Sequence, residues 1–208
     1  MKRLLLILLL LSGICRAESP VILVLGDSLS AAHGIAQSTG WVNLLQLRLQ
    51  EEGYPHRVAN ASISGETTVG GLNRLPALLV QHQPQIMIVA LGGNDGLRGL
   101  SFGRMRDNLL QIVQLGQKRN SRVLLLGIML PPNYGKAFND KFLAVFPEIV
   151  GQTDISLVPF FLQGVADRPE WMQMDGLHPN RFGQPRVLEN VWEELEPLLK
   201  VGTAESTM

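Results

Sequence analysis

Cysteine is almost absent from this chain of 208 residues. The single cysteine, Cys15, cannot close a disulfide within the chain, and it lies in an N-terminal stretch built like a secretory signal peptide. That stretch has two basic residues, an unbroken aliphatic run over residues 4–11, and small residues up to Ala17. We expect cleavage after Ala17, which removes residues 1–17 and leaves 18–208 as a single domain without thiol chemistry.

Long apolar runs are also missing. The run in the leader is far shorter than the ~18 residues that a membrane-spanning helix requires, and no later segment reaches that length without polar residues. A lipid anchor on Cys15 is disfavoured, because Ile14 rather than a small residue precedes it. We therefore expect an exported protein with no stable membrane anchor.

Neither sign of charge is in excess. Eighteen basic residues balance eighteen acidic ones, and loss of the three basic residues of the leader leaves a formal charge of −3. Without a basic run, nucleic acid is not an expected partner. The four histidines are scattered and no H-E-x-x-H motif occurs, which disfavours a metallohydrolase, so we expect no metal and no other cofactor.

What the chain does contain is a regular alternation of two patterns. Strand-length aliphatic runs end in glycine, proline or polar residues, at 21–25, 56–62, 85–91, 122–130 and 155–160. Helical spacing of apolar residues follows each of them, at 40–53, 67–82, 103–119, 139–150 and 181–200. Strands that are apolar throughout and alternate with helices predict an α/β fold, a three-layer α/β/α sandwich around a five-stranded parallel sheet.

Polar residues gather at the edge where the carboxyl ends of these strands meet. In "GDSLS", Ser28 is either a nucleophile or a helix N-cap, and Ser30 in place of glycine excludes the G-x-S-x-G elbow. Gly65 in "NASISGETT" either turns a backbone N–H into the crevice or is a loop glycine with positive φ. Asn94 in "LGGNDG" either aims its carboxamide at the same edge or satisfies its own loop, and Asp95 is assigned to loop architecture.

A fourth loop, "MDGLHPN", precedes the last helix. Its Asp175 and His178 lie three residues apart, so the carboxylate can reach one imidazole nitrogen, fix the tautomer and leave the other nitrogen as a general base. The alternative is that Asp175 caps the turn and His178 lies at the surface. Because four such loops converge on one edge, we favour a joint catalytic role over four separate structural roles.

In this order, "GDSLS", "SISGET", "LGGNDG" and "DGLHPN" resemble the four blocks of the SGNH, or GDSL-type, hydrolase family, and the similarity runs over essentially the whole mature chain. The resemblance implies that Ser28 is the nucleophile, His178 its base and Asp175 the orienting acid. It implies an oxyanion hole made by the Ser28 N–H, the Gly65 N–H and the Asn94 side chain. It also implies a flavodoxin-like sandwich that needs no metal.

The expected function is that of a periplasmic or secreted serine esterase. The resemblance implies that its substrates are small molecules, namely acyl esters and thioesters such as acyl-CoA, lysophospholipids and aryl esters, and we expect it to act as a monomer. Two alternatives stay open: a carbohydrate O-acetyl esterase, and a non-catalytic lipid- or carbohydrate-binding module that uses the same crevice.

Three further expectations concern the surroundings of Ser28. Residues 97–102, 129–134 and 160–162 form either an apolar groove for the acyl chain or ordinary core. Met172 and Met174 are expected to pack rather than to bind a ligand. Ala32 stands where members of the SGNH family often carry glycine, so the nearby wall of the substrate site is expected to differ in shape from theirs.

Overall fold

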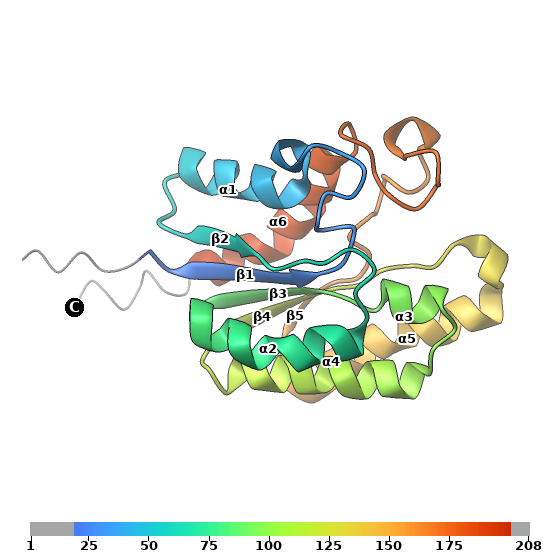
Figure 1. Cartoon of the computed structure of the whole chain (residues 1–208), viewed down its shortest axis with the longest axis horizontal. Coiled ribbons are helices and arrows are strands. Elements are labelled where there is room, and N and C mark those ends of the chain that lie inside the picture. Colours follow the sequence, from blue (N-terminus) through green and yellow to red (C-terminus); the bar gives the residue numbers. More distant parts are fainter. Residues whose placement is uncertain (1–18, 201–208) are drawn as a thin grey trace, which may run out of the picture.

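The computed structural model describes residues 19–200, and its centre is a parallel β-sheet (Figure 1). The strands are β1 (Val21–Gly26), β2 (Arg57–Asn60), β3 (Ile86–Ala90), β4 (Arg122–Leu126) and β5 (Ser156–Val158). They lie in the order β2-β1-β3-β4-β5, and every neighbouring pair is parallel. This is the flavodoxin-like order, so the predicted fold class is confirmed. The leader over residues 1–17 and the tail over 201–208 lie outside the described residues.

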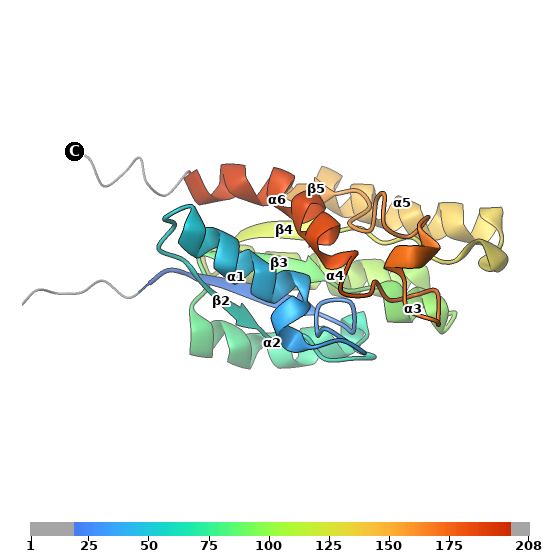
Figure 2. The ribbon, with the colours of Figure 1, turned by 90° about the horizontal axis from the view of Figure 1, so that it is seen from above.

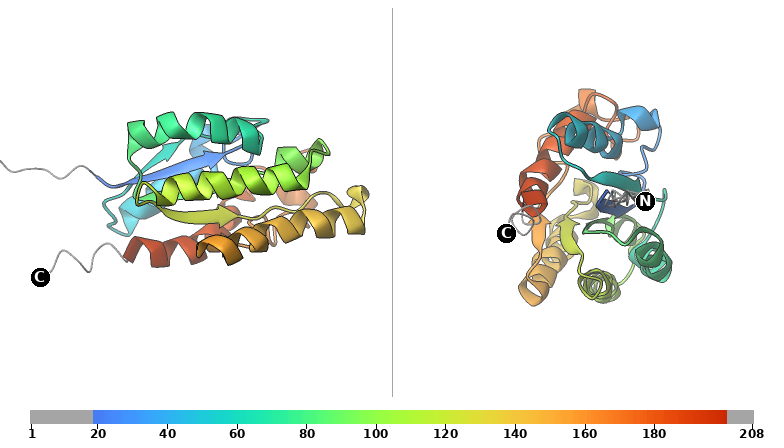
Figure 3. Two further views of the ribbon diagram at one scale, coloured as in Figure 1. Left: turned by 90° about the horizontal axis from the view of Figure 1, so that it is seen from below. Right: turned by 90° about the vertical axis from the view of Figure 1, so that its left-hand side faces the viewer.

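Helices cover both faces of the sheet and complete three layers. Helices α1 (Trp41–Glu51) and α6 (Gln184–Lys200) pack together on one face (Figure 2). On the other face, α4 (Phe102–Gln117) packs between α2 (Thr68–His82) and α5 (Lys136–Thr153) (Figure 3). In residues 19–200, no helix has both the length and the apolar character that crossing a bilayer would require.

The two central strands explain why their sequences are apolar throughout. Every residue of β1 and β3 is buried, because helices cover both faces of the sheet there. Gly26 pairs with Ala90 at the last step of the register, so the chain leaves both strands at the same level. Between β1 and β3 the strand order reverses, and the loops on either side of such a point open a crevice.

The structure differs from the predicted elements mainly in short segments that have no repeating pattern of apolar residues. Helix α3 (Gly93–Leu97) and three single turns were not predicted, namely η1 (Gln37–Thr39), η2 (Pro132–Tyr134) and η3 (Pro169–Trp171). Each is shorter than two helical turns and rich in glycine, proline or polar residues. Strand β4 ends at Leu126 rather than at residue 130. Strand β2 lies at the edge of the sheet and has only four residues, of which the first and the last are exposed.

Candidate active site

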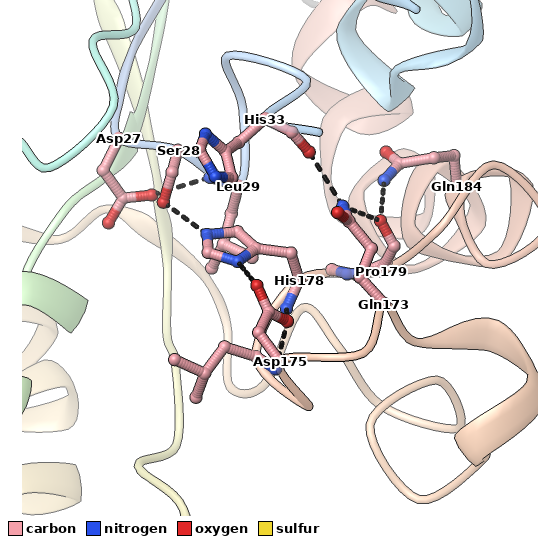
Figure 4. A network of polar contacts seen from close by, with 10 residues as sticks. Asp27, Ser28, Leu29, His33, Gln173, Asp175, His178, Pro179 and Gln184 are labelled. Carbon is pink, nitrogen blue, oxygen red and sulfur yellow. Dashed lines mark hydrogen bonds and ion pairs between the residues drawn. The ribbon is translucent and has the colours of Figure 1, made fainter. Parts of the chain in front are cut away.

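Ser28 lies in a tight turn that follows β1. The backbone N–H groups of Ser30 and Ala31 both donate to the carbonyl of Asp27, and that of His33 donates to the carbonyl of Ser28. No helix begins there, and the Ser28 hydroxyl points across the crevice instead of capping a backbone N–H (Figure 4). The alternative in which Ser28 is a helix N-cap is therefore wrong, because the residues that follow it form consecutive turns and not a helix.

Asp175 and His178 lie on one tight turn that precedes α6. The turn is closed by the Gln173 N–H, which donates to the His178 carbonyl at 2.8 Å, and it includes Gly176 with φ of +66°. Asp175 Oδ1 accepts the backbone N–H groups of Leu177 and His178, at 2.9 and 3.1 Å. These two bonds fix one oxygen of the carboxylate and direct the other at the imidazole.

A continuous chain of contacts joins this turn to the loop after β1. His178 Nδ1 lies 2.7 Å from Asp175 Oδ2, and His178 Nε2 lies 2.8 Å from Ser28 Oγ (Figure 4). The Ser28 turn directly follows the carboxyl end of β1, whereas the Asp175 turn comes from the segment between η3 and α6. The structure thus brings together residues that are 150 positions apart in sequence.

The protonation state of Asp175 decides which nitrogen of His178 carries the hydrogen. Partial burial raises the pKa of Asp175, but hydrogen bonds from the Leu177 N–H and from the ring and N–H of His178, together with the charge of His178, lower it to about 2. Asp175 is therefore an ionised acceptor, and Nδ1 of a neutral His178 must hold the hydrogen. Nε2 is then free to accept the Ser28 hydroxyl hydrogen.

The other two predicted site residues lie on the loops beside Ser28. Asn94 is on α3, directly after β3, and its Nδ2 donates to Asp27 Oδ2 at 3.1 Å. Gly65 has φ of +78°, and its carbonyl accepts the Arg98 guanidinium at 2.8 Å, which ties the loop after β2 to the end of α3. The alternative in which Asn94 bonds only within its own loop is wrong, because its partner belongs to β1's loop.

Asp95 has the structural role expected of it. Its side chain is buried and accepts both the backbone N–H and the hydroxyl of Thr68, at 2.9 and 2.6 Å. Thr68 is the first residue of α2, so these bonds hold the start of α2 against α3. They also fix the segment that carries Asn94.

Comparison with known proteins shows the family of this chain. The profile of the GDSL-like lipase/acylhydrolase family matches residues 24–185. The chain belongs to this family. It is 51% identical to esterase TesA of Pseudomonas aeruginosa over 184 residues, which cover 88% of this chain and 92% of that protein. It is 45% identical over 183 residues to the thioesterase 1/protease 1/lysophospholipase L1 of Escherichia coli K12, with 88% of this chain and 86% of that protein covered.

A solved structure gives the same result for the fold. The crystal structure of the psychrotrophic esterase EstA of Pseudoalteromonas, inhibited by monoethylphosphonate, superposes with a TM-score of 0.82 and 41% identity. The match covers 86% of this chain and 98% of that one. The present protein is therefore a GDSL hydrolase in both sequence and fold.

Three residues near the site of the hydrolase were missed by the sequence analysis. Asp27 is buried between Leu29 and Asn94, and Gln173 bridges the carbonyls of His33 and Pro179, at 2.8 and 3.2 Å. The His33 ring lies against the His178 ring, with centroids 4.8 Å apart. The aspartate of "GDSLS" was the available signal for Asp27, whereas nothing in the sequence links Gln173 to residue 33.

The apolar segments around the hydrolase site divide between core and surface. Phe161 and Leu162 are core residues, while the side chains of Leu100 and Met129 are exposed. Met172 packs on the core, but Met174 is fully exposed, so the expectation that it packs is wrong: it lies at the tip of the turn beside Asp175.

The backbone conformation of Ala32 explains why glycine is common at this position in the family. Ala32 has φ of +57°, a left-handed conformation that favours glycine and costs an alanine ~1 kcal/mol. Its Cβ occupies the space next to Gly40, at the start of α1. A pocket of about 330 Å³ opens there between the β1 loop, α1 and β2, and neither Ser28 nor His178 lines it.

Nowhere in residues 19–200 do side chains form a cluster suited to a metal ion.

Proposed function

We propose that this hydrolase is a serine esterase and thioesterase that uses Ser28, His178 and Asp175 as a catalytic triad. The observation that supports it most directly is the pair of contacts of 2.8 and 2.7 Å that runs from Ser28 through His178 to Asp175. A serine hydroxyl becomes a useful nucleophile when a neutral imidazole can accept its hydrogen and a carboxylate can stabilise the imidazolium that results.

The reaction takes two steps of the same kind. Ser28 Oγ attacks the acyl carbon while His178 Nε2 takes the hydroxyl hydrogen; the imidazolium then gives that proton to the departing alcohol or thiol. Water enters, loses a proton to His178 and attacks the acyl-enzyme, and the proton returns to Ser28 Oγ as the acid leaves. Asp175 remains ionised throughout and holds the imidazole in place.

The oxyanion that forms in both steps needs hydrogen-bond donors already in position. We assign this role to the backbone N–H groups of Ser28 and Gly65 and to Asn94 Nδ2. The contact between Arg98 and the Gly65 carbonyl supports the place of Gly65 in this set, because it ties the loop that carries Gly65 to the end of α3, the helix that carries Asn94. Asn94 Nδ2 gives one hydrogen to Asp27 and keeps a second one for the oxyanion.

The substrate class rests on the relatives and on the surroundings of the site. Relatives of this chain are named esterase, arylesterase, and thioesterase, protease and lysophospholipase, so we propose that the substrates are acyl-CoA thioesters, lysophospholipids and aryl esters. The exposed side chains of Leu100 and Met129 offer apolar surface for an acyl chain. We further propose that residues 1–17 direct export to the periplasm, and that the enzyme acts there as a monomer without a cofactor.

A panel of substrates tests this proposal against the alternatives. The purified enzyme is expected to hydrolyse nitrophenyl esters and acyl-CoA thioesters of medium and long chains faster than acetyl esters, measured as kcat/KM by product release. A clear preference for acetylated sugars would instead favour the O-acetyl esterase. Absence of turnover on the whole panel would leave only the binding module.

Replacing Asn94 by alanine is expected to lower kcat by about 10²- to 10³-fold, because one oxyanion donor is lost while substrate contacts stay. KM should change little, and circular dichroism should show a folded protein, since the half-buried amide makes its hydrogen bond to Asp27 and no other with residues 19–200. Steady-state kinetics on a nitrophenyl ester measure both constants. An unchanged kcat would remove Asn94 from the mechanism.

A further inference from the structure

Asp27 is a buried carboxyl group for which the proposed triad has no use. The residue is 3% exposed, and it directly precedes Ser28. No basic side chain forms an ion pair with it among residues 19–200. Its partners are two N–H donors: the Leu29 backbone on Oδ1 at 3.0 Å, and Asn94 Nδ2 on Oδ2 at 3.1 Å. Burying a carboxylate without a cation is costly, so its retention needs a reason.

The two oxygens of Asp27 face different tasks. The bond from Leu29 closes a local turn of the kind that many aspartates make, and it explains Oδ1 alone. The bond from Asn94 joins loops 67 positions apart and is the one that the Asn94 side chain makes with the described residues. A carboxamide held by a single bond can turn over. With its oxygen in place of its nitrogen, it would repel an oxyanion instead of binding it.

We propose that Asp27 is a positioning residue that holds the Asn94 carboxamide with its nitrogen toward the reacting oxygen. As a carboxylate, Asp27 accepts one Nδ2 hydrogen, fixes the orientation of the amide and leaves the second hydrogen for the oxyanion. The role rests on the proposed function, because it assumes that Asn94 acts as an oxyanion donor. Asp27 itself touches no substrate.

The charge of Asp27 is essential to this role. Burial raises the pKa of Asp27 to about 6, although the Leu29 N–H, the charge of His178 and the Asn94 amide lower it in part. Apart from His178, its surroundings are not ionisable: Leu29, Ala90, Leu91, Gly93, Leu126, Ile128 and Phe161 line the space beside it. Below a pH of about 6, the Asp27 carboxyl takes up a proton and one of its oxygens becomes a hydroxyl. The hydroxyl hydrogen then faces an N–H donor, so the hydrogen bond from either Leu29 or Asn94 is lost.

The isosteric variant Asp27→Asn tests the proposal. Its amide oxygen can accept from Leu29 or from Asn94, but its NH₂ group then opposes the other donor. We expect kcat to fall by about 10- to 10²-fold, less than the loss of the donor itself, with KM within about threefold of the wild-type value. The melting temperature at pH 8 should not fall, because a buried charge has been removed.

A double variant separates positioning from a general structural role. In the Asn94→Ala background, Asp27→Asn should lower kcat by less than about threefold, because the group that Asp27 positions is already absent. If the two losses multiply, Asp27 acts independently of Asn94 and the proposal is wrong. It is equally wrong if Asp27→Asn alone keeps kcat within twofold of wild type.

A measurement that needs no substitution at Asp27 gives a second test. The ratio of the wild-type kcat to that of Asn94→Ala should fall about tenfold from pH 7.5 to pH 5, as Asp27 takes up its proton and Asn94 loses its support. Any pH effect that the two proteins share cancels in this ratio. If the wild type is active and the ratio stays constant, the proposed role of Asp27 is wrong but the proposed function stands. If the wild type is inactive, the proposed function itself is wrong.

Discussion

Replacement of Ser28 by alanine is expected to lower kcat for ester hydrolysis by on the order of 10⁵- to 10⁶-fold. The variant loses the atom that forms the acyl-enzyme, so both steps of the reaction lose their covalent intermediate. The protein should stay folded, because Ser28 Oγ is half-buried and its contact is with the half-buried His178. Steady-state kinetics on a nitrophenyl ester, with circular dichroism as the folding check, measure the effect.

Ser30 supplies a matched control for this substitution. It is a second hydroxyl two positions along the same turn, it is buried, and its Oγ has no hydrogen-bond partner within residues 19–200. Ser30→Ala should therefore keep kcat within a few-fold of wild type. An alkylphosphonate probe followed by peptide mass mapping should modify Ser28 and leave Ser30 free. Labelling of Ser30, or a Ser28→Ala variant with near wild-type kcat, would mean that the nucleophile is misassigned.

The sequence was sufficient to predict the fold because its signals are repeated. Apolar runs of strand length alternate with helical periods across the whole chain, and each unit supports the same parallel sheet. Helix α3 was missed because its five residues include two glycines and span little more than one turn. It matters for the site, because it carries both Asn94 and the buried Asp95.

The candidate site was predictable as a set of residues but not as a set of contacts. The order of the four motifs pointed to Ser28, Gly65, Asn94, Asp175 and His178, and the structure places Ser28, Asp175 and His178 in one hydrogen-bonded chain. Asp27 was missed because its role depends on a bond to Asn94 across the crevice. Sequence spacing carries no information about that distance.

Asp27 also shows how the site competes with stability. Its folded-state pKa of about 6 lies above the ordinary 3.8, so the native protein binds a proton that the unfolded chain releases between these values. Stability is therefore lost as the pH rises from about 4 to about 6, and the ionised carboxylate costs ~3 kcal/mol above that range. That cost is consistent with a group retained for catalysis rather than for folding.

Asp175→Asn is expected to lower kcat by about 10⁴-fold through the tautomer of His178. In the native turn, Oδ1 accepts the N–H groups of Leu177 and His178, so this position requires an acceptor. An asparagine keeps its oxygen there and turns its NH₂ group toward His178 Nδ1. Nδ1 must then become the acceptor, which moves the ring hydrogen to Nε2 and leaves no base for the Ser28 hydroxyl.

Nitrogen-15 NMR of the histidine ring can observe this exchange directly. In the wild-type enzyme at pH 8 the hydrogen should be on Nδ1, and in Asp175→Asn on Nε2, while the fold is unchanged. Asp167→Asn is the matched control, since it neutralises an exposed carboxylate on the segment leading to the same turn and should keep wild-type kcat. If Asp175→Asn retains kcat within tenfold of wild type, the carboxylate caps the turn and does not orient the base. The contact of 2.7 Å to the imidazole would then have no part in the reaction.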